Sequence, residues 1–203
     1  MAATFDAATD ITSGAATSIS LTHTATGTDR CAFVGGGAVD GAPGLVSSGT
    51  YGGVALVEKW DAIYATFYTH FGLTLVAPAT GAQTVTVNWA VTNDGSSMAV
   101  VTATSVDQTT PVGTAATATG NSAAPSVNVS AATNDLVVDN LVYIGSGTAT
   151  HGTGQTQRTS NVNVAGEIGH YTTTEAGAAT VTMSHTIASN QWAIGGIAFK
   201  AAA

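Results

Sequence analysis

Apolar and polar residues alternate strictly along several short segments of the chain. In residues 84–91, Val85, Val87, Trp89 and Val91 share one side, and threonine, asparagine and alanine fill the other. Residues 180–187 follow the same pattern. A period of two places successive side chains on opposite faces of an extended strand, so it indicates strands with one buried face. Threonine, the second most frequent residue, favours strands on the solvated side.

One segment reads differently. Leu136–Ile144 is almost continuously apolar, which is typical of a strand covered on both faces near the centre of a sheet. Asp139 and Asn140 interrupt it and therefore need hydrogen-bond partners or exposure. Evidence for helix is thin: residues 54–71 are predicted to form two strands, with one short helical turn around Glu58–Ile63 as an alternative for that stretch.

Turn-forming residues recur every 10 to 15 positions, a spacing that suits an all-β sandwich or barrel. We predict an antiparallel, jelly-roll-like β-sandwich of about ten strands with little or no helix. The length of 203 residues fits one domain over residues 1–203. Runs rich in glycine, threonine and serine predict long loops near residues 35–49, 108–125 and 145–160.

Two stretches of the chain resemble each other. A strand carrying His23-Thr24 precedes a turn, an apolar strand and Gly35-Gly36; a strand carrying His185-Thr186 precedes a turn, an apolar strand and Gly195-Gly196. This echo predicts two similar hairpins near opposite ends of the chain.

Within the second hairpin, Trp192 and Ile194 share one parity, whereas Ile197 and Phe199 share the other. A change of parity inside one strand predicts a β-bulge at Gly195-Gly196 that redirects the side chains.

Charge is scarce in this chain. It holds 4 basic and 12 acidic residues, 8% of the sequence, against about one quarter in an ordinary soluble domain. The basic residues are too few and too scattered to bind phosphates along one face, so no nucleic acid partner is expected. The N-terminus lacks the features of a secretory signal, and no 18-residue apolar run exists, so we expect neither secretion nor a membrane partner.

Candidate ion ligands are few. His23 and His185 have inward parity and could meet at one end of the sandwich, but no third ligand lies near them, so a strand-end histidine is the favoured interpretation. Asn134-Asp135 with Asp139-Asn140, and Asn93-Asp94, are candidates for calcium, although such residues more often form turns. We predict no metal site and no cofactor.

Signs of catalysis are equally weak. Glu58, Asp61, Glu167 and Glu175 are the only acids that could form a glycosidase-like pair, and no nucleophile or phosphate-loop motif is present. We therefore predict no enzyme and no catalytic residue. Trp60 is expected as the one exposed tryptophan ring that could stack on a sugar, and Cys31 as a buried, inert thiol.

The runs Ala16–Thr24, Ser48–Leu56 and Trp192–Phe199 resemble Thr/Gly/Ala-rich, jelly-roll-like modules of tailed-phage virion surface proteins. The resemblance spans most of the chain but its motifs are structural. It implies a capsid decoration (cement) protein on the outer face of the phage head, made in the host cytoplasm, with the major capsid protein as partner.

Two other functions stay open at this point. One is a carbohydrate- or receptor-binding module of a fibre or tail, and the other is a self-assembling shell or sheath subunit. Exposed strand edges are usually protected by lysine, proline or bulges, and this chain has two lysines and four prolines. We therefore expect neighbouring copies to cover its edges in a homo-oligomer, most simply a trimer, with the loops at residues 108–125 and 35–49 clamping the contact.

Overall fold

The computed structural model describes residues 1–39, 46–164 and 167–203. It confirms an all-β, antiparallel fold of the sandwich and jelly-roll type, and no helix occurs among the described residues. There are more strands than the ten or so expected from the turn signals. The strands are β1 Thr4–Ala25, β2 Cys31–Val39, β3 Val46–Tyr51, β4 Val54–Ala55, β5 Val57–Tyr64, β6 Tyr68–Val76, β7 Gly81–Thr104, β8 Ala116–Ser122, β9 Ser126–Val129, β10 Leu136–Ile144, β11 Thr150–His151, β12 Thr156–Val164, β13 Ile168–Ala176, β14 Val181–Thr186 and β15 Asn190–Phe199.

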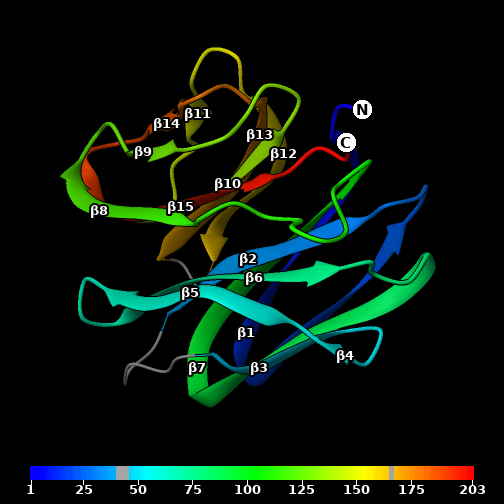
Figure 1. The fold of residues 1–203 in the computed structure, drawn as a ribbon. Coiled ribbons are helices and arrows are strands. Elements are labelled where there is room, and N and C mark those ends of the chain that lie inside the picture. The colour runs from blue at the N-terminus through cyan, green and yellow to red at the C-terminus, as the bar shows by residue number, and fades with distance from the viewer. Residues whose placement is uncertain (40–45, 165–166) are drawn as a thin grey trace.

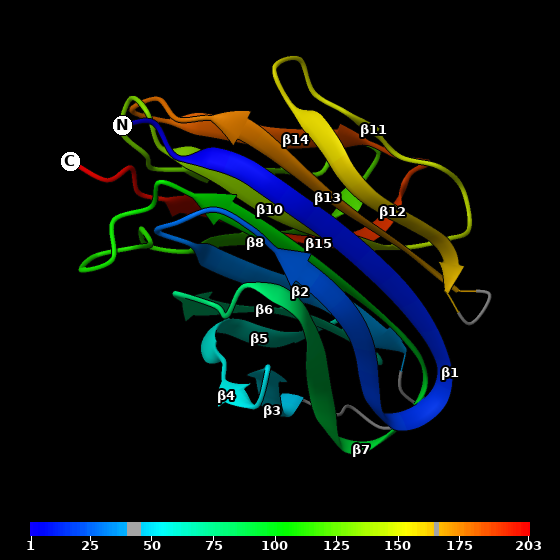
Figure 2. The ribbon, with the colours of Figure 1, turned by 90° about the vertical axis from the view of Figure 1, so that its right-hand side faces the viewer.

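The strands form a stack of layers (Figures 1 and 2). The seven-stranded sheet has the order β4-β3-β7-β2-β6-β5, with β1 paired to β7. The early part of β7 pairs with β3 and the later part with β2, so this sheet bends back over itself. Beside it lie a five-stranded sheet, β12-β13-β10-β15-β8, and a three-stranded sheet, β11-β14-β9.

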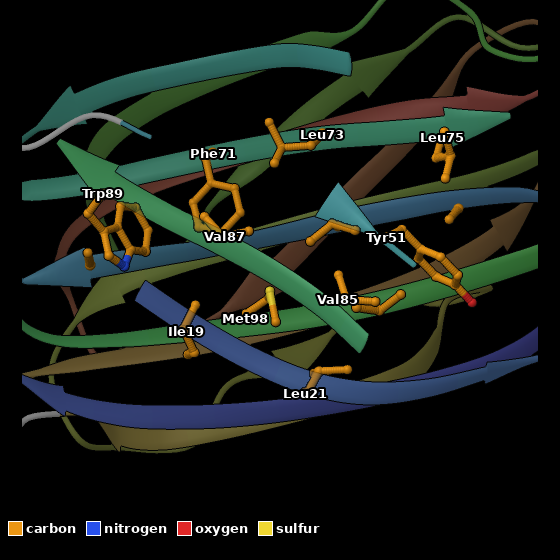
Figure 3. Close-up of a cluster of buried hydrophobic side chains, with 14 residues drawn as sticks. Ile19, Leu21, Tyr51, Phe71, Leu73, Leu75, Val85, Val87, Trp89 and Met98 are labelled. Atoms are coloured by element: carbon orange, nitrogen blue, oxygen red, sulfur yellow. The ribbon is translucent and has the colours of Figure 1, made fainter. Parts of the chain in front are cut away.

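The bent sheet encloses the first hydrophobic core. Val85, Val87 and Trp89 come from the early part of β7, and they pack with Phe71 of β6 and Met98 from the later part of β7 (Figure 3). All five side chains are buried. Three of the four alternating residues of this segment therefore point into a core, as their period predicts, whereas Val91 is exposed.

The strand pairings reveal an internal repeat. Strands β8 to β15 repeat the arrangement of the first half in chain order. β8 and β9 correspond to the first and second parts of β1, and β10, β11, β12 and β13 correspond to β2, β3, β5 and β6. β14 and β15 correspond to the first and second parts of β7. Every pairing among these strands recurs: β10 with β13 and β15 matches β2 with β6 and the later β7, and β14 with β9 and β11 matches the early β7 with β1 and β3. The pairing of β3 with the short β4 has no counterpart among the described residues of the second half. We call residues 1–104 the first sandwich and residues 105–203 the second sandwich.

Each sandwich has an inner five-stranded sheet and an outer sheet of three strands, an eight-stranded jelly-roll arrangement to which the short β4 adds one more outer strand in the first sandwich. A bulge at the same place in β5 and β12, together with the register, fixes which residues are equivalent. Phe33 pairs with Thr74 and Val101, and Val138 pairs with Thr174 and Ile197. Phe33 and Val138 therefore occupy the same position in the two inner sheets.

The two inner sheets pack against each other. Phe33, Val101, Val138 and Ile197 belong to one buried cluster between them. Glycines in β2 make room for side chains of β10. A Cβ on Gly37 would lie 2.8 Å from Val142 Cγ1, closer than real Cβ contacts come.

Two predictions about β10 and β15 have different outcomes. β10 lies between β13 and β15 and is buried on both faces, as its continuous apolar sequence predicts. The bulge predicted at Gly195-Gly196 is wrong, because β15 keeps one register with β10 and β8 through both glycines. The parity changes because both faces of β15 are buried: Ile194 faces the core of the second sandwich and Ile197 the other sandwich.

The three predicted long loops also need correction. Residues 35–39 belong to β2, residues 46–49 belong to β3, and residues 40–45 lie outside the described residues. The other two segments contain β8, β11 and the start of β12. Glycine-rich and alanine-rich sequence marks close packing here, since a Cβ on Gly36 would lie 2.0 Å from the carbonyl oxygen of Ser97. The helical turn considered at Glu58–Ile63 is strand β5 instead.

Candidate interaction site

A groove lies where the edges of the two inner sheets meet, with β5 on one side and β8 on the other. Its volume is about 480 Å³. The turn after β5, the end of β8 and the start of β15 supply its lining. The lining residues are Ile63, Tyr64, Ala65, Thr119, Gly120, Asn121, Gln191 and Trp192.

None of these lining residues is charged. Trp192 closes one side: its indole N–H donates to Ser122 Oγ at 3.1 Å. The indole packs against Gly120, where a Cβ would lie 2.5 Å from the ring. Tyr64 is buried, its hydroxyl has no hydrogen-bond partner among the described residues, and desolvation raises the pKa of that hydroxyl above its usual range. The groove therefore offers hydroxyl and amide groups beside aromatic rings.

Trp60, expected to be an exposed ring, is only 7% exposed, so that prediction is wrong. The ring lies across the interface between the inner sheets, where Cβ atoms on Gly72 and Gly195 would come within 2.3 and 2.5 Å of it. It packs against Phe33 and His70, with ring centroids 5.5 and 5.6 Å away. Two glycines far from it in sequence create this recess, and a period of two cannot reveal them.

The two inward histidines are buried but do not share a site. His23 hydrogen-bonds with Thr9 and Thr102, whereas His185 Nε2 lies 2.7 Å from Asp139 Oδ2. They belong to different sandwiches. Among the described residues, no three His, Cys, Asp or Glu side chains are placed to hold a metal ion.

Asp139 is part of a buried polar network in the core of the second sandwich. Besides His185, Asp139 accepts hydrogen bonds from the backbone N–H and the hydroxyl of Thr173, at 2.7 and 2.8 Å. Gln155 Nε2 donates to the same hydroxyl at 2.6 Å. The sequence pattern marked Asp139 and His185 for different reasons and did not predict that they form one network.

The other calcium candidates serve the backbone. Asp135 accepts from the N–H groups of Ala132 and Ala201, at 2.8 and 2.9 Å, and so holds the C-terminal segment against a turn. Asn93 is buried, and its side-chain amide has no hydrogen-bond partner in residues 1–39, 46–164 and 167–203.

A second recess of about 480 Å³ lies between Asp107, Asp135 and Lys200. Asp107 accepts from the N–H groups of Thr109 and Thr110, which lower the pKa of its carboxyl. Both acids of this recess therefore already accept hydrogen bonds from backbone N–H groups.

The four acids considered for catalysis are not gathered into one pair. Asp61 accepts from the N–H of Val46, and burial raises its pKa to about 6. Glu167 accepts from the hydroxyl of Tyr68 at 2.8 Å. Glu58 lies on β5, and Glu175 lies on β13 of the other sandwich.

Cys31 is buried as expected, and desolvation raises the pKa of its thiol to about 12. Among the described residues, no helix is long and apolar enough to cross a membrane. Neither a protein-family model nor a curated protein matches the chain. The resemblance to phage surface modules therefore stays a hypothesis.

Proposed function

We propose that the chain is a structural protein of a virus particle, a decoration protein that binds the major capsid protein on the outer face of a tailed-phage head and stabilises the shell. It acts at the capsid surface as a homo-oligomer, with a trimer as the expected assembly. A fold alone does not specify a function, so the proposal depends on the surface.

The observation that carries the proposal is the chemistry of the two outer sheets. Hydroxyl and amide groups replace charges there and bond to each other: Ser20 Oγ lies 2.8 Å from Thr86 Oγ1 in the first sandwich, and Thr182 Oγ1 lies 2.8 Å from Asn128 Oδ1 in the second. Such faces are hydrated without ion pairs, and burying them against a shell desolvates no charge. These properties suit a coat that covers a large area.

Binding to capsids prepared without this chain tests the proposal. We expect the wild-type protein to sediment with such capsids and to raise the temperature at which they lose their contents. Thr86→Lys and Thr182→Lys place a charge on one outer sheet each, so the face that contacts the shell is the one whose variant binds less. Absence of binding by the folded wild-type protein would overturn the proposal.

The groove supports a second candidate, a carbohydrate-binding module of a fibre or tail. Its uncharged lining of hydroxyl, amide and aromatic groups suits a neutral saccharide. A glycan array separates the two functions: a ligand whose binding is lost in Asn121→Ala and Gln191→Ala supports this candidate. Particles or filaments formed by the protein alone would instead favour a self-assembling shell subunit.

A further inference from the structure

Strand edges in this protein are protected to very different degrees. An unprotected edge presents a row of unpaired N–H and C=O groups, which pair readily with another strand. β5, the edge of the first inner sheet, is protected: it carries Glu58, Lys59 and Asp61 in succession, and a bulge interrupts its register between Glu58 and Trp60.

The edges on the opposite side are protected as well. β12 carries Arg158 and two register shifts. The Arg158 guanidinium lies 3.7 Å from the centre of the Phe5 ring on β1, so β1 and β12 contact each other across the two inner sheets. β1 itself carries Asp6 and Asp10 and two register shifts.

β8 has none of these protections. It pairs with β15 through seven consecutive residues without a register shift, and its other side pairs with no described strand. It contains no charged residue and no proline. Among the described residues, the outer-sheet part of β1, Ser18–Ala25, is also an uncharged edge with a continuous register. The other edge strands there are short: β4 and β11 have two residues each and β9 has four.

The groove adds a second feature at the same edge. Thr119, Gly120 and Asn121 of β8 form one wall of the groove, and Ile63 and the turn after β5 form the other. A strand added to β8 would run beside this groove, which could then receive its side chains. Strand addition of this kind takes its affinity from main-chain hydrogen bonds and its specificity from such pockets.

We propose that β8 is the edge on which a second copy of this chain docks, by adding a strand to the inner sheet of the second sandwich. The absence of charge on β8 and along the groove selects an uncharged strand, and the threonine-rich strands of this chain have that composition. The net charge of −8 makes copies repel each other elsewhere, so an uncharged edge is where they approach at least cost. The inference rests on the proposed homo-oligomer and names its contact.

Single lysine substitutions test the edge. Thr117→Lys and Thr119→Lys give β8 the protection it lacks, and Ala62→Lys, at an exposed position of the already protected β5, is the matched control. We expect each β8 variant to weaken self-association by about tenfold or more, and the control to leave it unchanged. Sedimentation equilibrium measures the association, and thermal melting confirms that all three variants fold.

Hydrogen exchange gives a readout without substitution. The amides of residues 116–122 should exchange more slowly in the wild-type oligomer than in the diluted monomer, whereas those of β5 should not change. An oligomer that survives both β8 substitutions with unaltered exchange at β8 overturns the inference and leaves the proposed homo-oligomer standing. A wild-type protein that stays monomeric at about 100 µM overturns both this inference and the proposed homo-oligomer. Binding to capsids then tests the proposed decoration role separately.

Discussion

The two sandwiches have the same strand pairings but fill equivalent core positions with different chemistry. Register places four apolar residues of the first sandwich where the second has polar ones. The equivalent pairs, first sandwich before second, are Val34 and Asp139, Leu56 and Gln155, Leu73 and Thr173, and Trp89 and His185. One fold therefore accommodates an apolar core and a hydrogen-bonded polar core at the same place.

The comparison shows that the polar network is not required by the fold. It is tolerated because its central groups are paired: Asp139 has three donors and Gln155 bonds to both neighbouring strands. Burying polar groups costs little when they are hydrogen-bonded and much when one partner is missing. The second core should thus be more sensitive to single substitutions than the first.

The largest expected effect follows from Asp139→Val, which puts the first-sandwich residue into the unchanged second core. We expect a loss of about 3–5 kcal/mol in the free energy of unfolding, because His185 and Thr173 lose a buried partner. Urea unfolding followed by tryptophan fluorescence measures it. Val34→Ala is the control in the apolar core and should cost about 2 kcal/mol.

The quadruple variant Asp139→Val, Gln155→Leu, Thr173→Leu, His185→Trp copies the whole first core and should recover most of that loss. A cost for Asp139→Val below that of Val34→Ala would contradict the comparison, since the polar network would then contribute nothing.

Much of the layer structure can be predicted from the sequence, but the repeat cannot. Strict alternation places Val85, Val87 and Trp89 in a core, and the continuous run at Leu136–Ile144 lies between two strands as expected. The echo between the two His-Thr strands, however, joins strands that are not equivalent: β1 and β2 match β9 and β10, whereas β14 and β15 match the two parts of β7. Pairing preserves the repeat where residue identity does not.

The candidate site was missed for a related reason. The groove combines residues from β5, β8 and β15, and each of these segments reads as an ordinary strand or loop by itself. Glycine also misled the sequence interpretation, because Gly35–Gly37 mark close packing of layers and not a loop. The unprotected edge of β8 could have been suspected from a neutral tract without proline, had that tract been assigned to a strand.

Acid should destabilise the protein through two histidines at the interface between the sandwiches. His70 and His170 occupy equivalent positions in the two inner sheets, and both are buried. Desolvation lowers the pKa of His70 to about 4 and that of His170 to about 3. The unfolded chain binds these protons near pH 6.5, so stability is complete above that pH and falls as the pH drops toward the folded pKa values.

We expect unfolding at pH 5 to need about 4 kcal/mol less than at pH 7, about 2 kcal/mol for each histidine. Within the part of the chain that the structure describes, neither ring nitrogen of His170 has a hydrogen-bond partner, so His170→Leu should remove about half of this dependence at little cost at pH 7. Urea unfolding across pH 4.5–7 measures the effect, with the exposed His151→Ala as control. Equal slopes in all three proteins would show that the buried histidines do not set the acid sensitivity.

The interface between the sandwiches offers a smaller test. Gly195 is equivalent to Ala99, and Trp60 is equivalent to Thr159. On one side of the interface a large ring lies over a glycine, and the equivalent positions on the other side hold a threonine and an alanine. Gly195→Ala should cost about 1–3 kcal/mol, because its Cβ would meet the Trp60 ring.

In a Trp60→Thr background the same substitution should be nearly neutral, since the ring is gone. A double-mutant cycle measured by thermal and urea unfolding gives this coupling directly. Gly14→Ala, where a Cβ would meet nothing within 4 Å, controls for the change in backbone freedom. Equal costs in both backgrounds would mean that the glycine serves the strand itself and not the neighbouring ring.

The smallest expected effect concerns two basic residues at equivalent bulges, Lys59 in β5 and Arg158 in β12. Arg158 stacks on Phe5 and donates from Nε to Thr174 Oγ1 at 2.7 Å, whereas Lys59 lies at the free edge of β5. Arg158→Ala should cost about 1 kcal/mol, and Lys59→Ala less than about 0.5 kcal/mol. Arg158→Lys should fall between them, because an ammonium keeps the charge but loses the planar stack. Urea unfolding measures these costs. A larger loss of stability for Lys59→Ala than for Arg158→Ala would mean that the edge at β5 contributes more to stability than the edge at β12, the opposite of what we expect.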